Sequence, residues 1–354
     1  MTVKVSTIKL LSGLAIGAAA LLFSACSKAT PELHIYNWSD YFAEDTIRAF
    51  EAKYNCRVIY DVFESNEAMY AKLKAGATGY DVVFPTSYQA YMMENEGMIE
   101  DLDLSKIPNA ANIDPKFLKT VALDQHLRYS IPYMSGTTGI ALIADKVGDY
   151  EQSWNIYDRA DLKGRITLLN DYREVLGAAL KYLGYSLNTT NPAYVAEAGE
   201  VVKRWKANIA KFASDEYKPG IASGEFYVVQ GYSGDIMQVM DEAAEDTQID
   251  YFLPKEGFSF WADDMVIMKD APNKDLAYAF INFMHDPQVA ANNMEFTNYW
   301  APNAAAYELI PTELLENPMV FLSDEQMEKG EQIIPLGDKD RIYMDVWSKV
   351  KSEE

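Results

Sequence analysis

The chain has 354 residues, of which 49% are hydrophobic and 24% are charged, a composition typical of globular proteins and sufficient for two hydrophobic cores. Its 53 acidic residues outnumber 31 basic ones, and the net charge of −22 argues against nucleic acid as a partner, because nucleic-acid binders present basic faces. Two cysteines and three scattered histidines predict neither a disulfide framework nor a metal site, and we expect no cofactor.

The N-terminus has the pattern of a lipoprotein signal peptide. Lys4 and Lys9 precede an apolar run, residues 10–23, that leads through small residues to Cys26. We expect cleavage before Cys26 and a lipid on that cysteine, which would anchor an extracytoplasmic, periplasmic protein to the membrane. An ordinary secretory signal peptide is the alternative; a spanning helix is disfavoured because the run is short. Residues 1–25 carry two lysines and no acid, so the remaining 29 basic and 53 acidic residues give a net charge of −24.

Strands and helices alternate over the first part of the mature chain. Strands are predicted at residues 33–38, 57–63 and 80–85, and helices begin at Asp45 and Ser65 between them. Strand–helix–strand units connect by right-handed crossovers and build parallel sheets. We therefore expect a parallel sheet here.

The middle of the chain repeats this alternation. Two strands are expected at residues 129–134 and 139–144, on either side of a Ser-Gly-Thr-Thr turn, and an amphipathic helix at 201–212. The other predicted elements are strands at 165–170, 227–231, 249–253 and 258–268, and helices at 174–183 and 276–284. The whole pattern indicates two α/β units, followed by a mostly helical C-terminus.

Residues that follow the predicted strands are candidate site residues, because ligands of open α/β sheets bind beyond the carboxyl ends of the strands. Aromatic, hydroxyl and carboxylate side chains follow four of the strands, and no Gly-rich phosphate loop or lysine does. Such a collection suits a polar cationic ligand with an apolar body. These residues are Trp38, Ser39, Asp40, Tyr41, Thr86, Ser87, Tyr88, Asn170, Asp171, Glu174, Tyr232 and Asp235.

Trp261 and Asp263 form a further candidate pair. They stand two apart in a predicted strand, so their side chains point the same way. An aliphatic ammonium can use both, the carboxylate through a charge-assisted hydrogen bond and the indole through a cation–π contact. The alternative is a core tryptophan beside an aspartate at the edge of the sheet.

Ten segments together resemble the substrate-binding proteins of bacterial ABC polyamine importers, the spermidine/putrescine-binding family. No single segment is specific, but they run in the family's order over nearly the whole mature chain. They are residues 36–41, 64–73, 81–88, 129–133, 173–175, 183–185, 254–257, 261–263, 281–283 and 299–303.

The resemblance implies a two-lobed periplasmic-binding-protein-like α/β fold, with mixed sheets flanked by helices and crossover strands between the lobes. One lobe is expected to comprise residues 26–135 with 262–307, and the other residues 136–261 with 308–354. Matched position by position, the residues implied to bind ligand are Trp38, Ser39, Thr86, Tyr88, Asp171, Glu174, Tyr232, Trp261, Asp263 and Tyr299.

Some of these residues have plain structural alternatives. Asp171 and Glu174 can simply complement the dipole at the start of a helix. Ser39 and Thr86 can be turn or cap hydroxyls, and the tyrosines can be rim residues. The sequence alone leaves these readings open.

Two positions depart from the family pattern. Tyr232 stands where the family usually has tryptophan, so that ring is smaller here. Ile333 stands where members that use spermidine often have glutamine, with Gln332 adjacent. From both departures we expect putrescine to bind at least as well as spermidine.

The function implied by the resemblance is that of a monomeric, lipid-anchored polyamine receptor, for putrescine, spermidine or both. It would deliver its ligand to an ABC transporter permease by lobe closure, and it would not be an enzyme. One alternative is a glycoside hydrolase that uses Asp171 and Asp263 as an acid/base pair. Another is a binder of a different small cation, a sugar or an anion; sugars and anions favour amides or basic residues at the strand exits, which are acidic here.

Overall fold

The computed structural model describes residues 30–243 and 247–352, so the predicted signal peptide and Cys26 lie outside it. None of the helices in these ranges is long and apolar enough to cross a membrane. The strands are β1 Glu32–Asn37, β2 Arg57–Val62, β3 Val82–Val83, β4 Ile131–Ile143, β5 Ile166–Leu168, β6 Ile209–Phe212, β7 Val228–Tyr232, β8 Ile249–Phe252, β9 Phe258–Ile267 and β10 Gly330–Gln332. The α-helices are α1 Glu44–Tyr54, α2 Asn66–Lys74, α3 Ser87–Asn95, α4 Pro115–Thr120, α5 Ala144–Val147, α6 Tyr172–Tyr182, α7 Pro192–Lys206, α8 Tyr217–Ala222, α9 Ser233–Glu242, α10 Lys274–Met284, α11 Pro287–Thr297, α12 Thr312–Leu315, α13 Asp324–Lys329 and α14 Asp340–Ser352.

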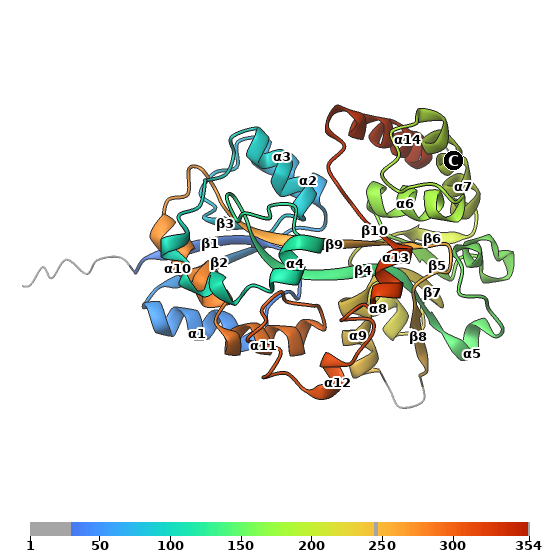
Figure 1. Ribbon diagram of the computed structural model, residues 1–354. Coiled ribbons are helices and arrows are strands. Elements are labelled where there is room, and N and C mark those ends of the chain that lie inside the picture. Colours follow the sequence, from blue (N-terminus) through green and yellow to red (C-terminus); the bar gives the residue numbers. More distant parts are fainter. Residues whose placement is uncertain (1–29, 244–246, 353–354) are drawn as a thin grey trace, which may run out of the picture.

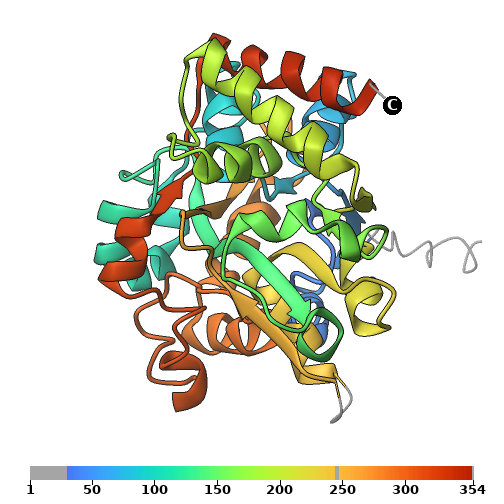
Figure 2. The same cartoon turned by 90° about the vertical axis from the view of Figure 1, so that its right-hand side faces the viewer.

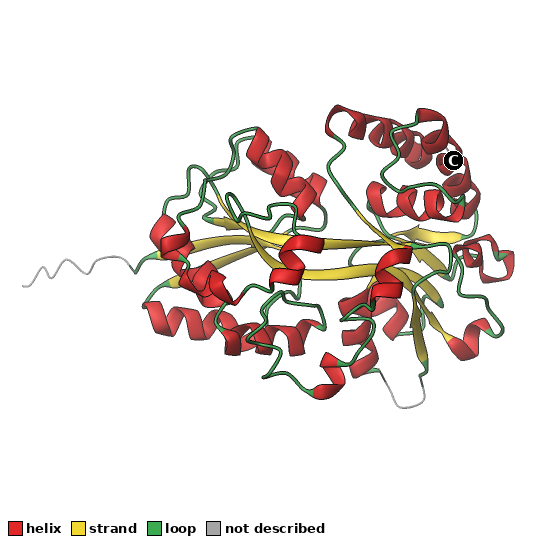
Figure 3. Cartoon of the chain, viewed as in Figure 1, coloured by secondary structure: helices red, strands yellow, loops and turns green. Residues whose placement is uncertain are grey.

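The molecule has two lobes that share two long strands (Figure 1). Neighbouring strands follow the order β2-β1-β3-β9-β4-β7-β5-β6, with β10 on β9 and β8 on β4. Figure 3 shows the strands as one layer through the whole molecule, with helices on both of its sides. The first lobe surrounds a core built from β1–β3 and α1, α3 and α10, and the second lobe surrounds a core built from β5, β7, α6 and α7. β4 and β9 contribute to both lobes, as the predicted crossover strands should.

The sheet is mixed. β1 pairs in parallel with β2 and β3, as the predicted crossovers require, whereas β9 runs antiparallel to β3 and β4. Ser65 starts α2 by accepting a hydrogen bond from the backbone N–H of Ala68. The expected two-lobed α/β fold with mixed pairing is therefore present.

The Ser-Gly-Thr-Thr turn predicted inside residues 129–144 is wrong, because β4 runs through it without interruption. Gly136 has a different reason to be glycine: a Cβ there would lie 2.8 Å from the rings of Trp261 and Tyr299. The residue allows two rings to lie on the backbone of β4, and no short-range pattern indicates this.

The predicted helix at residues 201–212 is also misplaced. Pro192 starts α7 earlier, behind Asn191, whose side chain caps the helix by accepting from the N–H of Ala193. The segment after α7 leaves the helix and becomes β6, which pairs in parallel with β5. The apolar residues at the end of α7 and those of β6 together have a helix-like spacing. This is why the sequence predicted one continuous helix.

The C-terminal residues return to both lobes. Ile310, Leu314 and Val320 pack in the core of the first lobe, although the sequence placed residues 308–354 with the second. Further on, α14 lies along α7 of the second lobe, as Figure 2 shows. Gly199 of α7 permits this approach, since a Cβ there would come within 2.5 Å of Val346.

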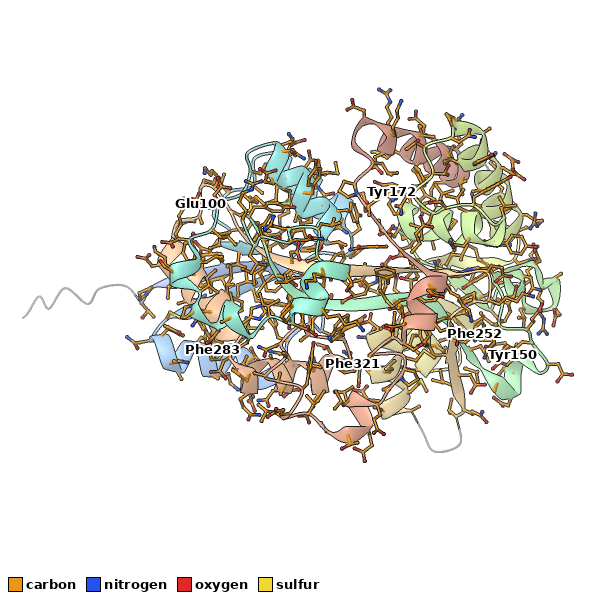
Figure 4. The ribbon with its side chains drawn as sticks, in the orientation of Figure 1. Glu100, Tyr150, Tyr172, Phe252, Phe283 and Phe321 are labelled. Carbon is orange, nitrogen blue, oxygen red and sulfur yellow. The ribbon has the colours of Figure 1, made fainter. Side chains whose placement is uncertain are left out.

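Aromatic side chains fill both lobes. In Figure 4, Phe283 lies in the first lobe, and Tyr150 and Phe252 lie together in the second, where their ring centroids are 5.6 Å apart. Tyr172, at the start of α6, donates a hydrogen bond to the Asp340 carboxylate. This bond ties the first turn of α14 to α6, whose N-terminus faces the space between the lobes.

Candidate functional site

A cavity of about 550 Å³ lies between the two lobes, and all ten predicted ligand-binding residues line it. The first lobe and the shared strand β9 contribute Trp38, Ser39, Thr86, Tyr88, Trp261, Asp263 and Tyr299, and the second lobe contributes Asp171, Glu174 and Tyr232. These side chains come from strand ends and helix starts that are distant in the sequence. The structure therefore brings the predicted residues together, while their role in binding stays a prediction.

The cavity has a buried inner part and an exposed mouth. The inner wall contains only residues that are less than one-tenth exposed: Tyr41, Asn66, Thr86, Tyr88, Asp171, Glu174, Trp261, Asp263, Tyr299 and Ile333. At the mouth stand the exposed acids Asp40, Glu64, Asp215 and Glu242. A ligand would consequently pass a negatively charged entrance before it reaches a largely apolar and aromatic interior.

Asp263 is the most unusual carboxylate of the inner cavity. It is 4% exposed, and its Oδ2 accepts a 2.7 Å hydrogen bond from the hydroxyl of Tyr41. Its Oδ1 is buried and has no hydrogen-bond partner among the described residues. Burial raises the pKa of Asp263 to about 7, against the hydroxyls of Tyr41 and Thr86, which both lower it. Oδ1 can therefore accept a bond from a ligand, with the hydroxyl of Thr86 close by.

Asn66, the first residue of α2, holds two of the predicted residues in place. Its Nδ2 donates to the hydroxyls of Thr86 at 2.9 Å and Tyr88 at 3.2 Å, and its Oδ1 accepts from the N–H of Thr86 at 3.1 Å. Thr86 stands at the N-cap position of α3, but its hydroxyl makes no capping hydrogen bond. Its side chain is therefore not a helix cap.

Aromatic rings form one wall of the inner cavity. The ring of Trp261 meets Tyr299 at 5.3 Å and Tyr232 at 5.8 Å between centroids, both edge to face. Burial, followed by the carboxylates of Asp171 and Glu174, raises the pKa of Tyr232, so this ring lies within the field of those acids. Trp261 and Asp263, two apart on β9, both line the cavity, as expected of side chains on one side of a strand.

Asp171 is both a helix cap and a cavity residue. Its Oδ1 accepts from the N–H groups of Arg173 and Glu174, at 2.8 and 3.0 Å, which confirms the structural reading of this residue. The buried carboxylate of Glu174 accepts from Ser259, and burial together with the charge of Asp171 raises its pKa. Arg173 does not line the cavity; its guanidinium donates to the carbonyl of Ile334 at 3.1 Å and lies 5.6 Å from the ring centroid of Tyr88.

Ile333 closes the wall beside Tyr88. It is buried, and it packs with Tyr88 of the first lobe and Leu187 of the second. The amide of the adjacent Gln332 donates to the carbonyl of Val121 and does not line the cavity. The side chain of Ile333 accordingly offers a ligand apolar contact and no hydrogen-bond acceptor.

Sequence reasoning did not include several cavity residues among the predicted binders. Asp235 accepts from the hydroxyls of Tyr217 at 2.7 Å and Tyr299 at 2.9 Å, so it joins α9 to the aromatic wall. Asp235 follows β7 in the sequence, and this place after a strand could have identified it as a cavity residue. Asn66 also follows a strand, β2, whereas Lys218 lies inside α8 and is revealed only by the approach of the lobes.

The charge of the cavity determines the sign of its ligand. Among the described residues, its lining contains one basic residue, Lys218, and eight acidic ones, namely Asp40, Glu64, Asp171, Glu174, Asp215, Asp235, Glu242 and Asp263. No group of three or more His, Cys, Asp or Glu side chains within residues 30–243 and 247–352 is arranged to hold a metal ion. An organic cation suits this lining, because a field of one sign concentrates ions of the other.

The chain belongs to the family of bacterial extracellular solute-binding proteins, whose family model matches residues 45–321. It is 35% identical to the putrescine-binding periplasmic protein of Escherichia coli, over 97% of this chain and 98% of that protein. It is 36% identical to the spermidine/putrescine-binding periplasmic protein of Salmonella typhimurium, over 96% of this chain and 97% of that protein.

Solved structures show the same likeness. A structure described as a putative spermidine/putrescine ABC transporter from Listeria monocytogenes superposes with a TM-score of 0.85, at 35% identity, over 91% of this chain and 99% of that chain. The family resemblance seen in the sequence and the two-lobed fold that it implied are both confirmed.

Proposed function

We propose that this solute-binding protein is a polyamine receptor, for putrescine, spermidine or both, that serves an ABC transporter. The proposal draws on the names of relatives that match nearly the whole chain and on a cavity whose lining suits an organic cation. An alkyl diamine is a run of methylenes with an ammonium at each end, so it needs carboxylates at its ends and apolar contacts along its length.

The buried Asp263 carries this proposal. A carboxylate with one unpartnered oxygen, beside the ring of Trp261, matches an alkyl ammonium in charge, hydrogen bonding and cation–π attraction. Each charged hydrogen bond contributes about 1.5–3 kcal/mol, and each desolvated cation–π contact about 0.5–2 kcal/mol. A few such contacts are sufficient for micromolar affinity, which corresponds to about 8 kcal/mol.

The other residues take complementary roles. Asp263 receives one ammonium, with the hydroxyl of Thr86 beside it, and Asp171 or Glu174 receives the other. The rings of Trp38, Tyr232, Trp261 and Tyr299 cover the methylenes, while Ser39 and Tyr88 complete the polar boundary. Desolvated negative charge in the empty cavity is thereby neutralised on binding.

Delivery of the ligand follows from lobe closure. A ligand that contacts both lobes binds the closed arrangement more tightly than the open one and shifts the population toward it. The closed monomer would then be recognised by the membrane permease, and a lipid on Cys26 would keep it near the membrane. Mass spectrometry of the mature protein from membranes tests the anchor: it should show an acylated N-terminal Cys26, and an unmodified N-terminus elsewhere would contradict it.

Calorimetric titration with putrescine, cadaverine, spermidine and spermine tests the ligand class. We expect saturable binding of at least one of these amines, with putrescine at least as tight as spermidine. A clear preference for spermidine would overturn the order, and binding of a sugar or of an anion in place of all four amines would overturn the class.

The competing function is that of a glycoside hydrolase, in which Asp171 and Asp263 would act as an acid/base pair. Asp171 uses one of its oxygens to cap α6, and burial raises the pKa of both Asp171 and Asp263, whereas an acid/base pair needs one carboxyl with a raised pKa and one that stays ionised. Release of p-nitrophenol from a panel of nitrophenyl glycosides, together with no thermal shift from diamines, would favour the enzyme. We expect the opposite pair of results.

A further inference from the structure

Lys218 is the one basic residue among the described residues that line the cavity. Its ammonium donates to Oδ2 of Asp40 and to Oε1 of Gln238, each at 3.1 Å. Asp40 belongs to the first lobe, where it follows β1, and Lys218 belongs to α8 of the second. The ion pair therefore crosses the mouth of the cavity.

The mouth is built to receive this ammonium. Asp40 has a left-handed backbone, with φ of 50°, which L-residues other than asparagine and aspartate seldom adopt. The side chain of Lys218 is only 18% exposed, whereas that of Asp40 is 63% exposed. The lysine stem thus lies against the wall of the cavity, and its charged end reaches out to the rim.

Further carboxylates surround the same place. Glu64 of the first lobe and Asp215 of the second both line the mouth. Partial burial and then the charge of Glu64 raise the pKa of Asp215, whereas the charge of Lys218 lowers it. The lysine ammonium is thus paired with Asp40 and lies within the field of Asp215, in acidic surroundings that a ligand ammonium would also prefer.

We propose that Lys218 determines specificity for diamines, because its ammonium occupies the acidic mouth that a third ammonium of a longer polyamine would otherwise take. This inference rests on the proposed function and refines its ligand class. A diamine places both of its charges in the inner cavity and stays clear of the mouth. A triamine must extend a third charge past Lys218, whose like charge repels it and whose partners are already engaged.

Replacement of the lysine charge tests the proposal. Lys218→Gln removes the positive charge and keeps a polar side chain, one atom shorter, that can still donate a hydrogen bond. By calorimetry, we expect the affinity for spermidine to rise at least fivefold and the ratio of spermidine to putrescine affinity at least tenfold. Lys218→Arg retains the charge and should keep the ratio of the unmodified protein.

Lys181→Gln is the matched control. The side chain of Lys181 lies in the same lobe, is as buried as that of Lys218 and pairs with Glu331 at 3.2 Å, but it does not line the cavity. Its removal should leave the affinity ratio unchanged. Thermal melting of each variant establishes that it is folded before titration.

The outcomes separate this proposal from the function on which it rests. If Lys218→Gln leaves the ratio unchanged, or weakens both amines alike, Lys218 acts at most as a clasp between the lobes and the specificity role is overturned. If the unmodified protein binds neither amine, the proposed function itself fails. An affinity ratio that rises in Lys218→Gln and stays unchanged in Lys181→Gln supports both.

Discussion

The hydroxyl of Tyr41 donates a 2.7 Å hydrogen bond to Oδ2 of Asp263, which lies 222 residues further along the chain. Both side chains are buried, so the bond fixes the carboxylate in one orientation and leaves Oδ1 without a partner. A buried acceptor that lacks a donor is costly. A ligand ammonium that donates to Oδ1 would remove this cost. Part of the favourable free energy of binding would therefore come from satisfying this oxygen.

Removal of the Tyr41 hydroxyl should weaken binding through the charge of Asp263. In Tyr41→Phe the carboxylate loses the hydrogen bond that lowers its pKa, so a larger fraction is protonated at pH 7. We expect roughly three- to tenfold weaker putrescine binding at pH 7, with part of the loss recovered at pH 8.5, because each pKa unit corresponds to a tenfold change in ionisation.

The control for this variant is Tyr157→Phe. The buried hydroxyl of Tyr157 donates to the carbonyl of Thr167 at 3.1 Å inside the second lobe, away from the cavity. It should cost stability alone. Equal putrescine affinities in Tyr41→Phe and in the unmodified protein at pH 7 would contradict the assigned role of Tyr41.

A methyl group at Gly136 should displace the aromatic wall. In Gly136→Ala the new Cβ lies 2.8 Å from atoms of the Trp261 and Tyr299 rings, so both rings must shift. Such overpacking costs about 1–3 kcal/mol, and we expect putrescine affinity to fall at least tenfold by calorimetry.

Gly177→Ala is the control for this change. A Cβ at Gly177, inside α6, meets its nearest neighbour at 3.4 Å, an ordinary contact, and alanine is the better helix former. This variant should bind putrescine as the unmodified protein does. Similar losses in both variants would mean that the rings are not part of the site.

Binding should depend on pH with a defined sign. Burial raises the pKa of Asp263 to about 7 and also raises that of Glu174, while an alkyl ammonium, with a pKa of about 10, stays charged. Only the ionised carboxylates attract the ligand, so affinity should fall as pH is lowered from 8 to 6, by up to about tenfold per unit.

Proton release is the direct measurement of this linkage. Titrations with putrescine at pH 7 in two buffers of different ionisation enthalpy should give different heats, because binding expels a proton from Asp263. The same difference should shrink in Asp263→Asn. Affinity that is constant from pH 6 to pH 8 would contradict the linkage.

The stability of the empty protein should show the opposite dependence. Asp263 and Asp264 both have a pKa of about 7 when folded and about 3.9 when unfolded, so the folded state binds their protons more tightly. Their contribution to the free energy of unfolding is fully present at a pH below the unfolded-state pKa of about 3.9. It is lost as pH rises through the folded-state pKa of about 7. The melting temperature should decline from pH 5 to pH 8, and less steeply in Asp264→Asn; an equal decline in this variant would exclude Asp264 as a source.

Local patterns were sufficient to predict part of the site. The two-residue repeat of a strand correctly placed Trp261 and Asp263 in one cavity, and strand exits correctly indicated Trp38 and Asp171. These features depend on neighbours in the sequence. The family resemblance then implied a two-lobed fold, whereas periodicity alone indicated only two α/β units.

Long-range contacts account for what was missed. Gly136 was read as a turn residue, although the rings that require it come from β9 and from the segment after α11. Tyr41 was a candidate site residue because it follows a strand, but its hydrogen bond to Asp263 was not predicted. Lys218 meets Asp40 only because the two lobes approach each other. Such relations are properties of the assembled fold, and no short window of sequence contains them.

Calorimetric titration of putrescine into Asp263→Asn tests the central claim most directly. The amide keeps the shape of the side chain and removes its charge, and we expect binding to weaken at least tenfold. Asp264→Asn is the matched control, since that neighbouring buried carboxylate accepts a 3.0 Å hydrogen bond from Ser130 and does not line the cavity. The account predicts near-normal affinity for Asp264→Asn and a large loss for Asp263→Asn; equal affinities in the two variants would contradict it.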